Sequence, residues 1–135
     1  VAQESLLSDA CPPVEDAVHF ATIDLADKVR AHYLVSFTNS GASVLGLTKF
    51  RPLMPLIAFS PKPATLRKLA LVWGVEPLQL GAVQSVDDLL SSATEFLLNK
   101  GMVREGETVV FTAGVPVGVS GGTNMIKVVK VEKAD

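Results

Sequence analysis

The residues best suited to bind a ligand lie in two loops that are rich in glycine and hydroxyl groups. The first loop reads Thr38-Asn39-Ser40-Gly41-Ala42-Ser43, and it follows a predicted strand and opens a predicted helix. Hydroxyls and free backbone N–H groups at a helix start can hold an anion, and open α/β sheets bind ligands at the carboxyl ends of their strands. Ordinary capping and turn formation also explain these residue types, because Thr, Asn and Ser are favoured there. Spacing alone favours that second explanation, and no Gly-Lys pair follows that would make a Walker A loop.

The second loop reads Gly114-Val115-Pro116-Val117-Gly118-Val119-Ser120-Gly121-Gly122-Thr123-Asn124. Its four glycines let a backbone approach a ligand closely, and Ser120, Thr123 and Asn124 offer polar side chains. The loop joins two predicted strands and opens no helix, so it is not a dinucleotide-binding fingerprint. A long hairpin loop without a ligand explains the composition equally well.

The other reactive residue types form no pattern that carries chemistry. His19 and His32 supply no metal-ligand set, and we expect them to be solvated or to cap helices. Cys11 precedes a proline pair and is interpreted as a structural or incidental thiol, while Trp73 is expected to anchor a helix end. Without a nucleophile–base pair, metal-ligand spacing or paired catalytic carboxylates, the residues favour a binding domain over an enzyme.

Hydrophobic periodicity supplies the elements that position the two loops. Apolar residues at spacings of three and four predict a helix over residues 14–31, and short apolar runs predict buried strands. Ser85 and Asp88 resemble a capping box at the start of another helix, and Gly74 is expected to close a helix. The predicted strands are 33–37, 56–59, 75–80, 108–113 and 125–131, and the further helices are 42–50, 64–72 and 85–99.

The alternation of these elements predicts an α/β fold with a mostly parallel sheet and helices on both faces. The last two strands have only about ten residues between them, too few for a crossover helix. The last strand is therefore expected to run antiparallel at an edge, where Lys127, Lys130 and Lys133 suit it. Residues 1–13 are interpreted as a linker and residues 14–135 as one domain.

Composition excludes several classes of protein. A chain of 135 residues has room for a single domain, and an apolar fraction of 48% excludes a disordered polyelectrolyte. A net charge of −2 argues against partners such as nucleic acid or an anionic membrane surface. One cysteine fits a reducing compartment, and the absence of a signal peptide or a long apolar stretch predicts a soluble, cytoplasmic protein. Because the chain starts at Val1 and not at methionine, excision from a longer chain is a hypothesis.

Five stretches, including both loops, occur in an order that is typical of one enzyme family. They read TNSGAS at 38–43, FRPLMPLIAF at 50–59, RKLALVWGV at 67–75, GETVVFTAG at 106–114 and GVSGGTN at 118–124. Together they resemble the C-terminal domain of pyruvate kinase, with a bacterial style in the last loop. The resemblance covers residues 14–131, nearly the whole chain.

The resemblance implies a three-layer α/β/α regulatory domain with a five-stranded mixed sheet, which contributes to one interface of a homotetramer. In the family, a barrel domain absent here converts phosphoenolpyruvate and ADP to pyruvate and ATP with magnesium and usually potassium. This domain is then expected to hold no cofactor, metal or catalytic residue and to be inactive alone. The first loop would cradle a phosphate of a sugar-phosphate effector, through Thr38, Asn39, Ser40, Gly41 and Ser43. The second loop would close over the sugar, through Gly114, Gly118, Ser120, Gly121, Gly122 and Thr123.

Departures from the family pattern concern the positive charges that hold phosphates. The family often has a basic residue at the place of Ala42, and its bisphosphate-binding members use tryptophan and arginine near the segment 78–98, which has neither here. Residues 31–48 and 105–125 also contain no Lys or Arg. Each missing hydrogen bond to a charged group costs roughly 1.5–3 kcal/mol, so we expect a sugar monophosphate or an AMP-like ligand. The alternatives are a ligand-free structural or interaction domain and a free-standing protein of the same fold.

Overall fold

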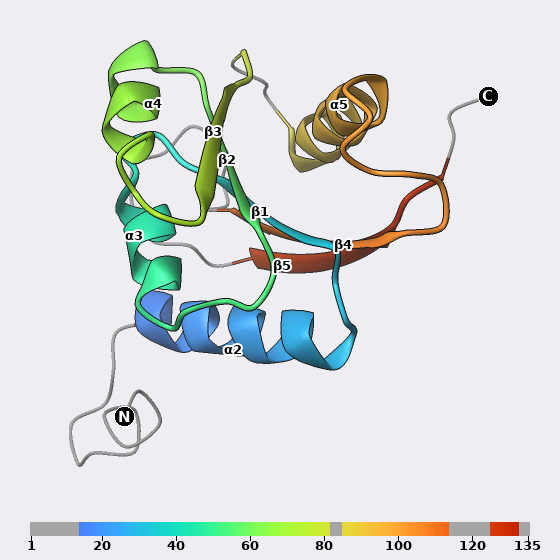
Figure 1. Cartoon of the computed structure of the whole chain (residues 1–135), viewed down its shortest axis with the longest axis horizontal. Coiled ribbons are helices and arrows are strands. Elements are labelled where there is room, and N and C mark those ends of the chain that lie inside the picture. The colour runs from blue at the N-terminus through green and yellow to red at the C-terminus, as the bar shows by residue number, and fades with distance from the viewer. Residues whose placement is uncertain (1–13, 82–84, 114–124, 133–135) are drawn as a thin grey trace.

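Helices and strands alternate along the described part of the chain, and two strands come last (Figure 1). The structure, a computed structural model, describes residues 14–81, 85–113 and 125–132. Its helices are α2 (Val14–Lys28), α3 (Ala42–Thr48), α4 (Pro63–Leu69) and α5 (Val86–Asn99). Its strands are β1 (Tyr33–Phe37), β2 (Leu56–Ser60), β3 (Val75–Gln79), β4 (Thr108–Ala113) and β5 (Met125–Lys130).

The five strands form one mixed sheet in the order β3-β2-β1-β4-β5. The first four strands are parallel, and β5 pairs antiparallel with β4, so that Ala113 lies opposite Met125. The predicted antiparallel edge strand is therefore confirmed. Lys127 and Lys130 are exposed on it, and Lys133 lies outside the described residues.

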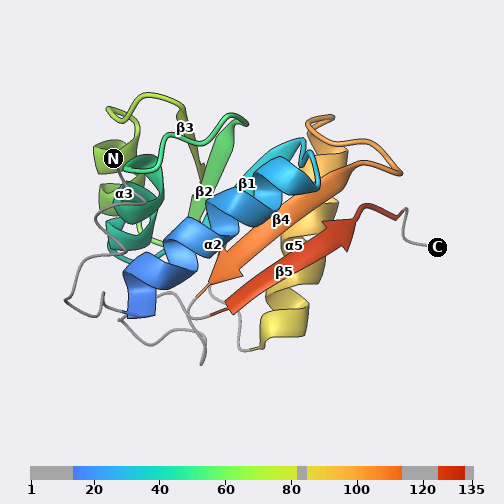
Figure 2. The same ribbon diagram turned by 90° about the horizontal axis from the view of Figure 1, so that it is seen from below.

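Helices cover both faces of the sheet, which confirms the three-layer α/β/α architecture. In Figure 2, α2 crosses in front of the sheet and α5 lies behind it. The chain moves from β1 to β2 to β3 in one direction and returns past β1 to reach β4. Right-handed crossovers then place α3 and α4 on the face that α2 covers, and α5 on the opposite face.

Two apolar clusters, one on each face of the sheet, make up the core. The first holds Leu34 of β1 together with side chains of the helices α2, α3 and α4. The second holds the neighbouring Val35 together with side chains of α5. The rings of Phe59 and Phe111 lie 5.6 and 5.9 Å from that of Phe37 in this second cluster. Burial on both faces explains why β1, β2 and β4 read as nearly continuous apolar runs and not as alternating ones.

The helices begin within one residue of the predicted positions, but three of the four end two or three residues earlier than predicted. Gly74 does not close α4 as expected, because α4 ends at Leu69, three residues before the predicted end, with Ala70 as its C-cap. Gly74 lies in the turn before β3 with a φ of 80°, a conformation that glycine adopts without strain. The Ser85 hydroxyl accepts a hydrogen bond of 3.1 Å from the backbone N–H of Asp88, as expected of an N-cap. The first helix ends at Lys28, three residues before the predicted end, and α3 ends at Thr48. In the part of the chain that the structure describes, no helix has the length and apolarity needed to cross a membrane.

His19 contradicts the expectation that the histidines are solvated or cap helices. It is only 4% exposed and lies on the face of α2 that packs against α3. A Cβ atom at Gly46 of α3 would overlap the His19 ring atoms Cε1 and Nδ1. The histidine is therefore part of the helix–helix contact, and a glycine at position 46 makes room for it.

We expect Gly46→Ala to destabilise the protein, although alanine favours a helix interior by about 1 kcal/mol over glycine. Overpacking a well-packed core typically costs about 1–3 kcal/mol, so the free energy of unfolding should fall by about 1 kcal/mol in a urea titration. The double variant His19→Ala, Gly46→Ala removes the overlap and should lose less than the two single variants together. Strictly additive losses would show that the two residues do not contact each other.

Candidate functional site

The first predicted loop lies at the point where the connections of the sheet change direction. The strand β1 is followed by α3 and β2 on one side, while its other neighbour, β4, is reached last of the four parallel strands. Ligands of open α/β sheets bind outside the carboxyl ends of the strands at such a switch point. Residues 38–41 leave the carboxyl end of β1 at this place, and residues 114–124 follow β4. The second predicted loop, including Gly114, Gly118, Ser120, Gly121, Gly122 and Thr123, lies outside the described residues.

The first loop is held in a fixed shape by its own hydroxyl groups. The backbone N–H of Gly41 donates to Thr38 Oγ1 at 2.8 Å, and the N–H of Ala42 donates to Ser40 Oγ at 3.3 Å. A hydroxyl that accepts such a bond can still donate its own proton. The Oγ atom of Ser43 lies 3.4 Å from that of the buried Ser36 in β1. The loop thus gathers three hydroxyl groups of the predicted set around one turn of backbone.

The helix α4 braces this loop from outside. Thr65 Oγ1 donates a hydrogen bond of 2.6 Å to the backbone carbonyl of Asn39. Gly41 has a φ of 93°, and a Cβ at this position would lie 3.3 Å from Leu69 Cδ2. Only glycine adopts this positive φ without strain and also leaves space for the Leu69 side chain. Asn39 and Gly41 therefore serve the loop through their backbone atoms.

The structure adds a cation that the local sequence did not suggest. We expected no positive charge at the loop, because residues 31–48 contain no Lys or Arg. That expectation is wrong, because a residue distant in sequence supplies the charge: Lys68 of α4 places its Nζ 3.5 Å from the carbonyl oxygen of Ser40. Lys68 is exposed, and its ammonium group lies at the backbone of the loop.

The distribution of charge along the sequence gives a signal for this cation. Residues 28–75 contain none of the 14 acidic residues of the chain. They contain seven of its 12 Lys and Arg residues, namely Lys28, Arg30, Lys49, Arg51, Lys62, Arg67 and Lys68. The segment is strongly basic in a chain whose net charge is −2. Four of these cations, Lys28, Arg30, Lys49 and Arg51, precede β1 or β2, whereas Lys62, Arg67 and Lys68 follow the carboxyl end of β2, and among them Lys68 reaches the loop.

The remaining candidate residues lie elsewhere. His32 is half-exposed near the amino ends of β1 and β4, with its Nε2 3.1 Å from Oε2 of Glu107. Cys11 lies outside the described residues. No group of three or more His, Cys, Asp and Glu side chains that could hold a metal ion occurs among the residues that the structure places.

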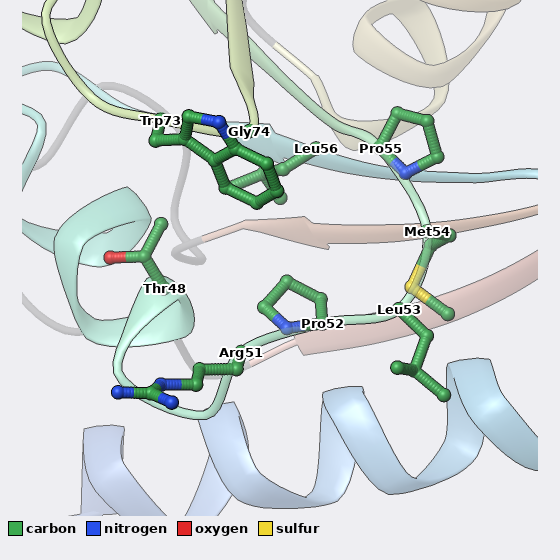
Figure 3. A pocket seen from close by; sticks show the side chains of 9 residues that line it. All are labelled: Thr48, Arg51, Pro52, Leu53, Met54, Pro55, Leu56, Trp73 and Gly74. Atoms are coloured by element: carbon green, nitrogen blue, oxygen red, sulfur yellow. The ribbon is translucent and has the colours of Figure 1, made fainter.

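Trp73 does not anchor a helix end, contrary to expectation, because its side chain is 95% exposed. It lines an apolar groove of about 650 Å³ together with residues 51–56 of the segment that leads into β2 (Figure 3). Trp73 and Gly74 precede β3, so the groove lies at the amino ends of β2 and β3. It is therefore at the edge of the sheet opposite to the loop at 38–43.

Comparison with known proteins identifies the family to which this fold and this loop belong. Residues 16–129 match the family model "Pyruvate kinase, alpha/beta domain". A pyruvate kinase of Clostridium acetobutylicum is 38% identical over 117 residues, which are 87% of this chain and 25% of that protein. A pyruvate kinase of Methylorubrum extorquens is 32% identical over 126 residues, which are 93% of this chain and 26% of that protein.

The solved structures agree on the fold. A pyruvate kinase of Cryptosporidium parvum superposes with a TM-score of 0.82 at 22% identity, over 97% of this chain and 25% of that one. The chain thus spans about a quarter of the length of the relatives that it matches. The chain belongs to the pyruvate kinase family, as the C-terminal α/β domain of the bacterial type.

Proposed function

We propose that this chain is the regulatory domain of a bacterial pyruvate kinase and binds a phosphorylated metabolite at the loop 38–43. The parent enzyme would transfer a phosphoryl group from phosphoenolpyruvate to ADP in the cytoplasm, with magnesium and potassium at its catalytic domain. In this proposal the ligand acts on that reaction from a distance, by binding one conformation of the enzyme more tightly than another. No step of the phosphoryl transfer is assigned to residues of this chain.

The observation that carries the proposal is the meeting of Lys68 with the hydroxyl-rich loop at the switch point of the sheet. Thr38, Ser40 and Ser43 offer hydroxyl donors, and Lys68 offers a cation within reach of the same turn. Phosphate oxygens accept hydrogen bonds from both kinds of group, and those from a charged donor are the stronger ones. Because α4 holds the loop through Thr65, the donors need little rearrangement when the phosphate binds.

The charges around the loop favour a ligand with a single phosphate. A second phosphate would need a second group of cations, and residues 78–81 and 85–98 contain none. A sugar monophosphate or an AMP-like nucleotide meets this condition, and fructose 1,6-bisphosphate does not. The glycine-rich residues 114–124 follow β4 in the sequence, and we propose that they close over the sugar.

We also propose that the chain contributes to an interface of a homo-oligomer. The strand β5 lies at the edge of the sheet, and its outer side pairs with no strand in the described part of the chain. Val128 of this strand is partly exposed between two lysines. An unpaired edge of this kind can pair with another chain, and lysines weaken such pairing without forbidding it.

Light scattering coupled to size-exclusion chromatography tests the oligomer. We expect a mass of at least two chains at micromolar concentrations, and we expect Val128→Lys to lower that mass by adding a third positive charge to the edge. A monomer at every concentration tested would contradict the proposal for the isolated chain.

A thermal-shift screen tests the ligand. We expect ribose 5-phosphate, glucose 6-phosphate or AMP to raise the melting temperature, since a ligand at 100 times its Kd stabilises a protein by about 2.7 kcal/mol. The same sugars and adenosine without phosphate are the controls and should give no shift. The bisphosphate should shift the melting temperature less than the best monophosphate. If none of these compounds produces a shift, a ligand-free structural domain is the better explanation.

Variants of the loop and of α4 locate the phosphate. Thr38→Ala should weaken binding because it removes a donor, and Ser40→Asp should abolish it because it places a negative charge against the phosphate. Lys68→Ala should weaken binding by up to about fivefold, since an exposed ion pair is worth roughly 0.2–1 kcal/mol. Arg67→Ala is the matched control, because Arg67 is an exposed cation in the same turn of α4 and makes no hydrogen bond to residues 38–43. Equal effects of Lys68→Ala and Arg67→Ala on the Kd would show only a general effect of charge.

A further inference from the structure

The two outermost strands of the sheet differ in how many backbone groups they offer to a strand of another molecule. The strand β3 lies at one side of the sheet and β5 at the other (Figure 2). In the described part of the chain, neither strand has a second neighbour on its outer side. A row of unpaired N–H and C=O groups can pair with another chain, so each outer side has to be examined as a contact surface.

The outer side of β5 carries a regular row of donors. The N–H of Val131, the residue after β5, donates to the carbonyl of Glu107 at 2.8 Å and therefore points toward the β4 side. Backbone groups of such a strand point alternately toward its neighbour and away from it, so Ile126, Val128 and Lys130 direct theirs outward. The strand β5 thus offers an outward N–H at each of three alternate positions.

Hydrogen bonds at the two ends of β3 identify its outer side. The N–H of Leu56 in β2 donates to the carbonyl of Gly74, just before β3. The N–H of Leu80, just after β3, donates to the carbonyl of Ser60 in β2, and both distances are 3.2 Å. Residues 74 and 80 therefore face β2, and by the same alternation residues 76 and 78 face it too. The outward positions of β3 are residues 75, 77 and 79.

Two of these three outward positions have no N–H to offer. The N–H of Val75 is already bonded to the carbonyl of Val72 at 3.3 Å, within the turn before β3. Position 77 is a proline, whose ring replaces the backbone N–H. Within the five residues of β3, Gln79 keeps an outward N–H that neither feature removes. Pro77 removes no bond from the sheet itself, because its nitrogen faces away from β2.

This difference between the two outer strands decides whether an assembly of copies can close. If both outer sides accepted a strand, β3 of one copy could pair with β5 of the next, and such a head-to-tail contact repeats into fibres unless the rotation happens to form a ring. If only β5 accepts a strand, two copies can pair through a twofold axis. Neither copy then offers a further strand.

We propose that Pro77 closes the β3 side of the sheet to strand addition and thereby limits strand pairing between copies of this chain to β5. The closure of β3 depends only on the backbone of β3 and of the turn before it. The limitation to β5 rests on the homo-oligomer proposed above. The two parts are therefore tested by different readouts.

The experiment restores the missing donor. Pro77→Val and Pro77→Ala both add an outward N–H, and the valine also adds a larger apolar side chain. Gln79→Val is the matched control, because it places a valine on the same face of the same strand without adding a donor. Circular dichroism first shows that each variant is folded, and sedimentation equilibrium then gives the average mass of each from micromolar to millimolar concentrations.

We expect both Pro77 variants to associate more strongly than the unmodified chain, and we expect Gln79→Val to behave like the unmodified chain. Each restored hydrogen bond strengthens an association by about two- to tenfold, and an antiparallel contact centred on residue 77 gains two such bonds. The average mass of the Pro77 variants should exceed that of the unmodified chain and keep rising with concentration. If the unmodified chain is a monomer, the oligomer at β5 fails, and the Pro77 variants should then form dimers.

Hydrogen exchange shows where the new contact forms. In the Pro77 variants, amide exchange of residues 75–79 should slow as the concentration rises, and in the unmodified chain it should not depend on concentration. Unchanged exchange of this segment in the folded Pro77 variants would overturn the proposal, whatever their mass. Association of Pro77→Val without that of Pro77→Ala, or equal association of Gln79→Val, would also overturn it, because the side chain and not the donor would then be responsible.

Discussion

The central strand β1 is hydrogen-bonded on both sides and covered by helices on both faces, and the rest of the molecule is arranged to satisfy that condition. Leu34 and Val35 point to opposite faces of the sheet, and both are fully buried. A parallel strand of this kind needs neighbours that return to the same edge through helices, because no short turn can join parallel strands. The crossovers through α3, α4 and α5 follow from this requirement, as do the two apolar clusters that they cover.

The parallel arrangement also gives the sheet two edges with different surfaces. At the carboxyl edge, the loop at 38–43 collects hydroxyls and receives Lys68 from α4. At the amino edge, the turns before β2 and β3 form an apolar groove around Trp73. The strands β1 and β2 run from one edge to the other.

Local sequence signals predicted the strands and the order of elements well. Strands 33–37 and 108–113 have the predicted bounds, because a buried parallel strand needs an uninterrupted apolar run that is visible in the chain itself. The antiparallel edge strand followed from a connection too short for a helix, which is again a local property. The helix ends were less accurate, since packing and not propensity decides where a short helix stops.

Predictions about single side chains failed where the answer depended on a distant part of the chain. His19 was expected to be solvated, but it is buried because α3 packs on α2 and Gly46 leaves space for its ring. Trp73 was expected to anchor a helix, but nothing in the described part of the domain covers it. The loop was expected to lack a cation, but Lys68 reaches it from 28 residues further along the chain.

The amino-acid sequence by itself determined the fold class, the order of the elements, the family and the position of the hydroxyl-rich loop. All of these depend on periodicity, turn residues and motif order, which can be read along the chain. Only the tertiary structure decided which charge stands beside the loop, which histidine is buried and which apolar side chains remain exposed. Those outcomes depend on contacts between segments far apart in sequence, and such contacts exist only after the crossovers have brought the helices against the sheet.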